Sequence, residues 1–574
     1  MDRHAVAEAL ERIAALLDLK GENAFKVRAF ENAARTVEAF PGDLAAALES
    51  GELKAVKGIG PATLEVVREC VATGRSSVLG ELRAEVPAGL VAMLRISGMG
   101  SAKVRAVHAQ LGIADLDGLE AAARDGRLAA LKGFGAKTAA KILKGVAFVR
   151  STEGFHLQHH AERAATALAA AAASLDGVTR AEAAGTVRRR CEVVREVDVA
   201  VTTALAPAAL ADALLRAGAV LDVVSADAAS ATVTCAGDVV ARLHVAPPDR
   251  YGHALAWATG SDAHLTQLAS HAAARGLTLD AHGLRDAAAT AVPCPTEAAF
   301  FGALGLAFIP PELREGADEV SRAAAGTLPR LVERGDLVGL LHCHTTYSDG
   351  SDTVAELAAA VQALGYRWLG ITDHSEAAAY AGGLSAERVA QQHAEIDDWN
   401  RANPGLRILK GIEADILADG RLDYDAATLD RFDFVIGSVH SRFDLDEEAM
   451  TARILRAMDD PHLTILGHPT GRLLLTRDPY PVDLRRVIAR AAERGVAIEI
   501  NADPQRFDLD WRLCREARDA GVAISIGPDA HSQAGLLNVD RGVGIARKGW
   551  LGPQDILNTR DVEGFLSHGQ ARRR

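Results

Sequence analysis

The chain has 574 residues, of which 49% are hydrophobic and 24% charged, so it is long enough for three or four domains with separate cores. We expect a soluble cytoplasmic protein, because no apolar run approaches the roughly 18 residues of a membrane span, the N-terminus lacks a signal-peptide pattern and no CxxC pair occurs. The net charge of −13 does not exclude nucleic acid as a ligand, since residues 1–150 carry 21 Lys and Arg against 18 Asp and Glu.

The first 150 residues show the apolar periodicity of helices, most clearly over residues 5–19 and 25–40. Three related segments, VKGIGPATLEVV, ISGMGSAKVRAV and LKGFGAKTAAKI, each place a Gly-apolar-Gly turn before a new helix. Such turns expose backbone N–H groups at a helix start, where a phosphate is stabilised. Glycine also serves ordinary tight turns, but three copies favour a helix-hairpin-helix pattern that holds the DNA backbone without reading bases. The candidate DNA-binding residues are Gly58, Gly60, Gly98, Gly100, Gly133, Gly135 and Lys137.

Residues 155–315 change to a mixed α/β pattern. Strands are predicted over residues 195–203, 219–226, 231–236 and 239–246, with alanine-rich helices between them. Residues 316–336 are predicted to be a polar connector to the C-terminal part of the chain.

Seven short apolar runs in the C-terminal part each end at a side chain that can bind or orient a metal ion. These side chains are His342 and His344, Asp373 and His374, Glu413, His440, His468, Asn501, and Asp529 with His531. Unbroken apolar runs are typical of buried parallel strands, and βα repetition predicts a barrel with its site at the carboxyl ends of the strands. Imidazole and carboxylate ligands without thiolate suit Zn²⁺, Mn²⁺ or Fe²⁺.

Together these motifs resemble the bacterial family X DNA polymerases (PolX) that carry a C-terminal PHP (polymerase and histidinol phosphatase) domain. The resemblance also rests on AGTVRRRCEVVREVDVAVTT, ATGSDAHLTQLA and ALGLAFIPPELREG, and covers nearly the whole chain. It implies a multidomain α/β protein: an all-α helix-hairpin-helix region, a nucleotidyltransferase-like palm and thumb, and a distorted (β/α)7 PHP barrel. We predict a lyase-like helical domain at 1–80, a fingers-like domain at 81–154, a palm and thumb at 155–315, a linker at 316–336 and the PHP domain at 337–574.

In PHP domains HxH, SDG, TDHS, GIE, SxHS, HPTGR and DAH supply a trinuclear metal cluster. The resemblance implies that His342, His344, Glu413 and Asp529 hold one ion, that Glu413 bridges to a second held by His440 and His468, and that Asp349, His374 and His531 hold the third. Mn²⁺ is favoured because the site is rich in carboxylates, with Zn²⁺ or Fe²⁺ as alternatives. The expected catalytic residues are Glu413, Asp529, His344 and Arg472, the last as a phosphate clamp.

The palm departs from the family pattern. Where an Asp-x-Asp pair belongs, the chain has Glu196 and Asp198, and Arg242 stands where the third carboxylate is expected. An arginine places positive charge where two Mg²⁺ or Mn²⁺ ions would sit, so we expect weak or no nucleotide addition. The expected nucleotide-binding residues are Gly185, Thr186 and Arg189.

Three functions remain open at this point. The leading one is a metal-dependent 3′–5′ exonuclease in DNA repair, including base excision repair, on gapped or 3′-ended DNA with a degenerate polymerase core. The second is an active gap-filling polymerase that takes dNTPs with altered metal dependence. The third is a PHP phosphatase joined to a DNA-binding module. A monomer without membrane association is expected in each case.

Overall fold

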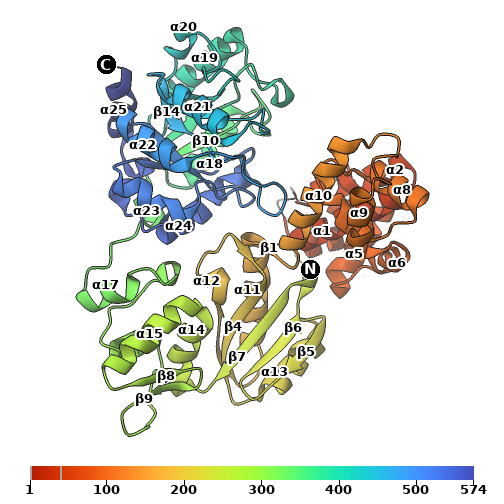
Figure 1. The fold of residues 1–574 in the computed structure, drawn as a ribbon, viewed down its shortest axis with the longest axis vertical. Coiled ribbons are helices and arrows are strands. Elements are labelled where there is room, and N and C mark those ends of the chain that lie inside the picture. The colour runs from red at the N-terminus through yellow and green to blue at the C-terminus, as the bar shows by residue number, and fades with distance from the viewer. Residues whose placement is uncertain (1–2, 39, 41, 574) are drawn as a thin grey trace. The chain divides into compact units, whose positions relative to one another are not determined.

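The computed structural model describes residues 3–38, 40 and 42–573. The chain forms two compact units, one comprising Met1–Phe155, Asp212–Val224 and Val233–Val240, the other His156–Ala211, Ser225–Thr232 and Ala241–Arg574. Within the described residues, no helix combines the length and apolar content that crossing a membrane requires. The elements confirm the multidomain α/β fold expected from the sequence (Figure 1).

The N-terminal region is entirely helical up to residue 151. Its helices are α1 (Arg3–Lys20), α2 (Ala24–Glu38), α3 (Leu44–Ser50), α4 (Glu52–Ala55), α5 (Pro61–Thr73), α6 (Ser77–Glu85), α7 (Ala88–Leu94), α8 (Ser101–Leu111), α9 (Leu116–Arg124) and α10 (Ala136–Ser151). Helix α1 buries Val6, Leu10, Ile13 and Leu17, whose spacing of three and four residues puts them on one face. This face forms part of the helical core.

A five-stranded sheet follows, with strand order β2-β4-β7-β6-β5. Its strands are β2 (Val178–Ala184), β4 (Glu196–Thr203), β5 (Asp222–Ala226), β6 (Ser230–Thr234) and β7 (Val240–Ala246). The four strands expected from the sequence are confirmed, whereas β2 was not predicted because its sequence, VTRAEAA, has three polar residues and three alanines, and only one of its residues is buried. Around the sheet lie β1 (His156–Leu157), α11 (Gln158–Ala173), α12 (Gly185–Arg188), β3 (Val193–Val194) and α13 (Pro207–Arg216).

The segment that resembles a thumb is mostly helical and holds a buried ion cluster. Its elements are α14 (Tyr251–Thr259), α15 (Asp262–Ala274), β8 (Thr278–Asp280), β9 (Gly283–Arg285), α16 (Glu297–Ala303) and α17 (Glu319–Ala325). Glu297 accepts hydrogen bonds from Arg314 at 2.7 Å and from Arg188 at 2.6 and 2.8 Å. Arg314 is fully buried, so its charge depends on this carboxylate for compensation.

The C-terminal part is a barrel of seven parallel strands in sequence order. The strands are β10 (Gly339–Cys343), β11 (Trp368–Ile371), β12 (Arg407–Asp415), β13 (Phe434–Ser438), β14 (Leu463–Leu466), β15 (Ala497–Asn501) and β16 (Ile524–Gly527). All seven coincide with the apolar runs of the sequence. The barrel closes just beyond β16, where the Ala530 N–H donates to the His342 carbonyl at 3.2 Å and the His344 N–H donates to the Ala530 carbonyl at 2.9 Å.

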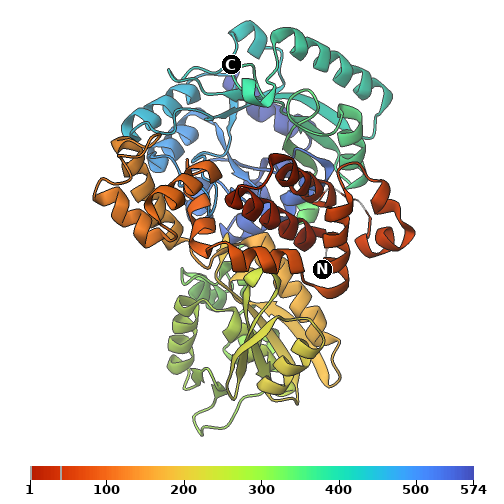
Figure 2. The same cartoon turned by 90° about the vertical axis from the view of Figure 1, so that its right-hand side faces the viewer.

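Helices cover the outside of the barrel, as Figure 2 shows. They are α18 (Val354–Ala363), α19 (Ala386–Ala402), α20 (Ala426–Leu429), α21 (Glu447–Met458), α22 (Leu484–Arg494), α23 (Trp511–Asp519), α24 (Val539–Lys548) and α25 (Val562–Arg573). Because both faces of each strand are covered, every residue of the strands β13 to β16 is buried. Parallel strands share one direction, so the loops after their carboxyl ends gather at one mouth of the barrel.

We predict that Glu297→Gln lowers the free energy of unfolding by about 3 kcal/mol, because Arg314 loses the charge that compensates its own. Burial raises the pKa of Glu297, but Arg188 and Arg314 outweigh it and lower that pKa. The stabilisation by Glu297 is therefore fully present above the pKa of a glutamate in the unfolded chain, about 4.3. It is lost as the pH falls through the lower pKa that Glu297 has in the folded protein. Urea unfolding at several pH values measures both effects.

The matched control is Glu448→Gln on the barrel surface, where Glu448 also pairs with an arginine, Arg486, at 2.6 Å. This pair is exposed, so its loss should leave the unfolding curve almost unchanged. Equal destabilisation by the two substitutions would contradict the role assigned to the buried cluster.

Candidate metal centre and polymerase-like site

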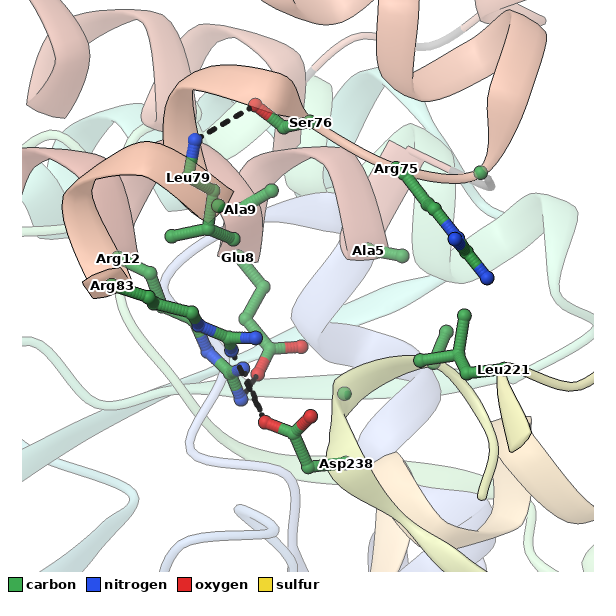
Figure 3. A pocket seen from close by; sticks show the side chains of 14 residues that line it. Ala5, Glu8, Ala9, Arg12, Arg75, Ser76, Leu79, Arg83, Leu221 and Asp238 are labelled. Atoms are coloured by element: carbon green, nitrogen blue, oxygen red, sulfur yellow. Dashed lines mark hydrogen bonds and ion pairs between the residues drawn. The ribbon is translucent and has the colours of Figure 1, made fainter. Parts of the chain in front are cut away.

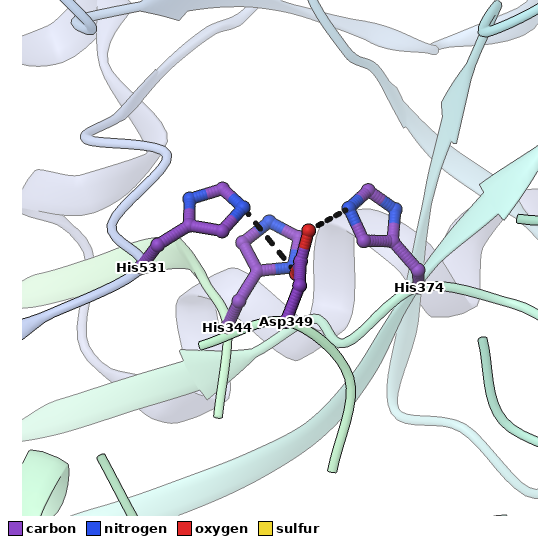
Figure 4. A group of neighbouring side chains, drawn as sticks. All are labelled: His344, Asp349, His374 and His531. Atoms are coloured by element: carbon purple, nitrogen blue, oxygen red, sulfur yellow. Dashed lines mark ion pairs between the residues drawn. The ribbon is translucent and has the colours of Figure 1, made fainter. Parts of the chain in front are cut away.

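The mouth of the barrel collects the nine residues expected to bind metal. They fall into four groups whose ligand atoms lie within 4.8 Å of one another: His344, Asp349, His374 and His531; His342, Glu413 and His468; His342, His344 and Asp529; His374, Glu413 and His440. Figure 4 shows the first group, with Asp349 between His374 and His531. Each histidine or carboxylate comes from the carboxyl end of a strand or from the loop that follows it.

Glu413 is the centre of this arrangement. Its carboxylate is 1% exposed, and the nearest imidazole nitrogens are those of His468 at 2.9 Å and His374 at 3.0 Å. His440 and His342 follow at 3.3 and 3.4 Å. A single buried carboxylate therefore touches four of the groups' histidines, which is the position that a bridging metal ligand requires.

The chemistry of the donor atoms fits divalent metal ions. Buried imidazole nitrogens of His342, His344, His374 and His468 have no hydrogen-bond partner among the described residues. Such nitrogens are costly to leave unsatisfied, and a metal ion would satisfy them. The opposite nitrogens of two ligands are held by carboxylates: Nδ1 of His342 lies 2.5 Å from Glu499, and Nδ1 of His440 lies 2.7 Å from Asp415. These contacts orient each ring so that its Nε2 points into the centre.

Electrostatics keep several ligands in the form that binds metal. Burial lowers the pKa of His344 to about 3, so its imidazole is neutral at physiological pH. Burial alone would raise the pKa of Asp349, but the hydrogen bond with His531 and the charges of His344 and His374 lower it to about 2. Asp349 is thus ionised, and His344 carries a free lone pair.

Backbone geometry at the mouth is unusual for non-glycine residues. His342 and Asp529 have φ angles of 60° and 52°, in the left-handed region that side chains disfavour. Such conformations cost about 1–3 kcal/mol each and persist only where the surrounding structure enforces them. Here the two residues flank the backbone hydrogen bonds that close the barrel, so closing the barrel also sets the direction of these ligands.

The structure places a different cation at the centre from the one expected. Arg472 donates to Asp510 at 2.7 Å and to the backbone carbonyls of Arg506 and Phe507, so its guanidinium is used within the fold. Arg506 instead faces the cluster, with its Nε 3.5 Å from Asp529. Burial opposes its charge, but Asp529 and Glu413 raise the pKa of Arg506, so it stays protonated. Its position five residues after the end of β15 is the one signal that the sequence offered.

The residues of the expected polymerase site are paired with one another. Nε of Arg242 lies 2.9 Å from Glu196, and Nε2 of His244 lies 2.8 Å from Asp198. A β-carbon at Gly185 would collide with the Asp198 carboxylate, so this backbone approaches the site closely. The Thr186 hydroxyl is buried and has no hydrogen-bond partner among the described residues.

Arg189, expected to bind a nucleotide, is instead a buried residue whose guanidinium is hydrogen-bonded within the protein. It donates to Glu315 at 3.0 Å and to the backbone carbonyl of Thr259. Nζ of the fully buried Lys548, on α24, donates to the Arg189 carbonyl at 3.0 Å and to Glu315 as well. The structure thus uses Arg189 in an ion cluster that reaches the barrel, because burial makes an unpaired guanidinium costly.

Four parts of the chain match known family models. Residues 1–76 match a helix-hairpin-helix domain, 91–147 a SAM-like helix-hairpin-helix tandem, 254–315 the DNA polymerase beta thumb and 341–503 the PHP domain. A protein of Bacillus subtilis (strain 168) named "DNA polymerase/3'-5' exonuclease PolX" is 34% identical over 99% of this chain and 99% of its own length. The chain belongs to the PolX family with a PHP domain. Each matched segment lies inside one of the predicted domains, whose boundaries stay a prediction.

Other relatives match a smaller share of this PolX chain. A "Probable phosphatase" of Thermoanaerobacter sp. (strain X514) is 27% identical over 38% of the chain and 89% of its own length. A "Probable phosphatase" of Edwardsiella ictaluri (strain 93-146) is 29% identical over 39% of the chain and 92% of its own length.

The helix-hairpin-helix turns have the backbone that the sequence predicted. In the first glycine of each pair, φ is positive, at 106° in Gly58, 81° in Gly98 and 90° in Gly133. The second glycines, Gly60, Gly100 and Gly135, are the N-cap residues of α5, α8 and α10. Lys137 lies in the first turn of α10, next to the exposed N–H groups of that helix start.

Asp238 does not replace the missing third carboxylate of the palm. It lies in the turn between β6 and β7 and pairs with Arg12 at 3.2 Å and Arg83 at 3.1 Å (Figure 3). These residues border a cavity of about 250 Å³ that Arg75 also lines. The carboxylate of Asp238 is thus engaged with two arginines outside the palm site.

Proposed function

We propose that this PolX protein is a metal-dependent 3′–5′ exonuclease on DNA, with a polymerase core that binds DNA but adds nucleotides poorly or not at all. The observation that carries the proposal is the buried Glu413 carboxylate inside its cage of histidines, with Arg506 beside it. The name of the Bacillus subtilis relative, which matches over the full length of the chain, supports the same reaction.

We further propose three divalent ions at this centre, with Mn²⁺ preferred. His342, His344 and Asp529 would hold one ion, Asp349, His374 and His531 another, and Glu413 would bridge to the ion at His440 and His468. In the structure His440 and His468 contact the same Glu413 oxygen, at 3.3 and 2.9 Å, which is compatible with a shared ion. When bound, such ions would activate a water and neutralise the charge of the phosphate oxygens.

The protein's own residues provide binding and orientation of the phosphodiester. Arg506 is the cation placed to contact a non-bridging phosphate oxygen, since its guanidinium already lies against Asp529. Glu499 and Asn501 hold ligands in place: Asn501 donates to Asp529 at 3.0 Å, and Glu499 contacts His342. A guanidinium held in place, like that of Arg506, needs no reorganisation as charge develops on the phosphate.

The DNA would be held through its phosphates and not through its base sequence. The three glycine turns present N–H groups at the starts of α5, α8 and α10, and Lys137 adds positive charge at the third. Phosphate binding by the helical region, combined with an exonuclease centre, fits gapped or 3′-ended DNA in repair as the substrate class. A monomer is sufficient, because all groups of the centre come from one chain.

The palm supports weak or absent nucleotide addition. Arg242 neutralises Glu196 at the position where Mg²⁺ or Mn²⁺ would be needed, and His244 engages Asp198. Burial raises the pKa of Glu196, which further disfavours the ionised form that a metal ion needs. A second candidate function, phosphomonoester hydrolysis, is favoured only by the relatives named as phosphatases, which match 38% and 39% of the chain.

The first test is resection of a labelled gapped duplex with Mn²⁺. We expect the unaltered protein to shorten the 3′ end, and Glu413→Ala to abolish this activity and lower the bound metal, while DNA affinity stays nearly intact. Metal analysis of both proteins and a filter-binding titration complete the measurement. Glu493→Ala, on the outer helix α22, is the control and should behave like the unaltered protein. Full resection by Glu413→Ala would refute the proposal.

A second test concerns the phosphate clamp. Arg506→Ala should lower kcat for resection by about a hundredfold, as loss of one fixed charge-stabilising donor does, and Arg506→Lys should recover part of it. Arg472→Lys provides the comparison, since Arg472 binds backbone carbonyls and should affect stability more than kcat. An unchanged kcat in Arg506→Ala would remove Arg506 from the reaction.

A third test concerns the palm. With dNTPs and the same gapped duplex, we expect little or no extension, and Asp198→Ala should leave resection unchanged because Asp198 serves only the inactive site. Gel analysis of the primer reports extension and resection together. Efficient extension that Asp198→Ala abolishes would show that the palm is an active polymerase.

A further inference from the structure

An exposed tyrosine lies beside the metal centre and has no role in the fold that the contacts explain. Tyr380, in the 3-10 turn Ala379–Ala381 after β11, is 72% exposed. The centroid of its ring is 6.2 Å from that of His374 and 6.4 Å from that of His440. Both histidines contact Glu413, so the aromatic ring stands at the edge of the centre itself.

The turn that carries Tyr380 is held firmly by the backbone. Ala378 donates to the Ser375 carbonyl at 3.0 Å, Gly383 to the Ala378 carbonyl at 3.1 Å and Leu384 to the His374 carbonyl at 2.9 Å. A β-carbon at Gly383 would collide with the Ser375 carbonyl, so the turn needs glycine at this position. The ring of Tyr380 is therefore presented by a fixed turn that starts at a metal ligand.

Other large exposed aromatic residues are placed differently. Phe308, 46% exposed, packs against Phe301 and lies under the guanidinium of Arg314. Phe25 lies on α2, in the helical unit. Tyr380 is the one among the exposed large aromatics of the described residues that contacts metal-binding side chains.

Exposing an aromatic face to water forgoes the stabilisation that its burial would give, which is sensible where a ligand covers it. Every nucleobase offers a flat π face, and stacking on an aromatic side chain tolerates any base. In a nucleotide, one sugar separates the phosphate from the base. If the phosphodiester lies at the centre, the distance from it to the base is therefore similar to the distance from the histidine rings to the ring of Tyr380.

We propose that Tyr380 stacks on the base of the 3′-terminal nucleotide whose phosphodiester is held at the metal centre, and so selects polynucleotide ends over phosphate esters that lack a base. This role rests on the proposed exonuclease function.

The test uses two single-stranded oligonucleotides that differ only at the 3′ terminus, which carries either a normal nucleotide or an abasic tetrahydrofuran residue. We expect the unaltered protein to favour the base-bearing end in kcat/KM by about fivefold to a hundredfold, the range that one aromatic–base stack produces. Tyr380→Ala should lose this preference with unchanged metal content. Tyr380→Phe and Tyr380→Trp should keep it, because they retain a π face.

The outcomes separate this inference from the exonuclease proposal. Hydrolysis of neither oligonucleotide by the unaltered protein would overturn the exonuclease function itself. Equal hydrolysis of both ends by the unaltered protein, or an undiminished preference in Tyr380→Ala, would overturn the role of Tyr380 alone. Loss of the preference in Tyr380→Phe as well would assign the effect to the hydroxyl and equally overturn stacking.

Discussion

A buried carboxylate at the mouth of a parallel barrel is the constraint on which the rest of the C-terminal structure depends. Glu413 is almost completely removed from water, where an ionised group without partners would be very costly. Nitrogens of His342, His374, His440 and His468 surround it at 2.9 to 3.4 Å, and carboxylates hold the opposite nitrogens of His342 and His440. The need to satisfy this one charge brings together residues from strands far apart in the chain.

The same principle explains why the polymerase-like site differs from what its sequence implied. Arginines that could have faced a nucleotide are instead paired with carboxylates: Arg188 with Glu297, and Arg189 with Glu315. Lys548, on a helix of the barrel, completes the second cluster. The charges of these arginines are therefore used within the second unit.

The two ends of the chain divide the work as the family relationship would suggest. The helical region has repeated glycine turns suited to phosphates at any sequence, and the barrel carries the cluster of histidines and carboxylates. Selectivity for a polynucleotide would then have two sources: binding of the DNA backbone by the helical region, and stacking of a base on Tyr380 at the centre. In the palm, Glu196 is paired with Arg242 and Asp198 with His244, so under the proposed function this region would bind DNA without adding nucleotides efficiently.

The sequence by itself determined the seven barrel strands and the nine candidate ligands, because an apolar strand that ends in a metal-binding side chain is a local pattern. It also determined the glycine turns, since the first glycine of each pair adopts a positive φ angle that other residues disfavour. Tertiary structure alone decided that Arg506, and not Arg472, faces the centre, and that Arg189 serves a buried ion cluster. Those outcomes depend on which acceptors lie within reach of each guanidinium after folding. Folding likewise decided that Tyr380 lies close to His440 as well as to His374, because His440 follows a different strand, β13, and only the closed barrel brings it to the turn after β11.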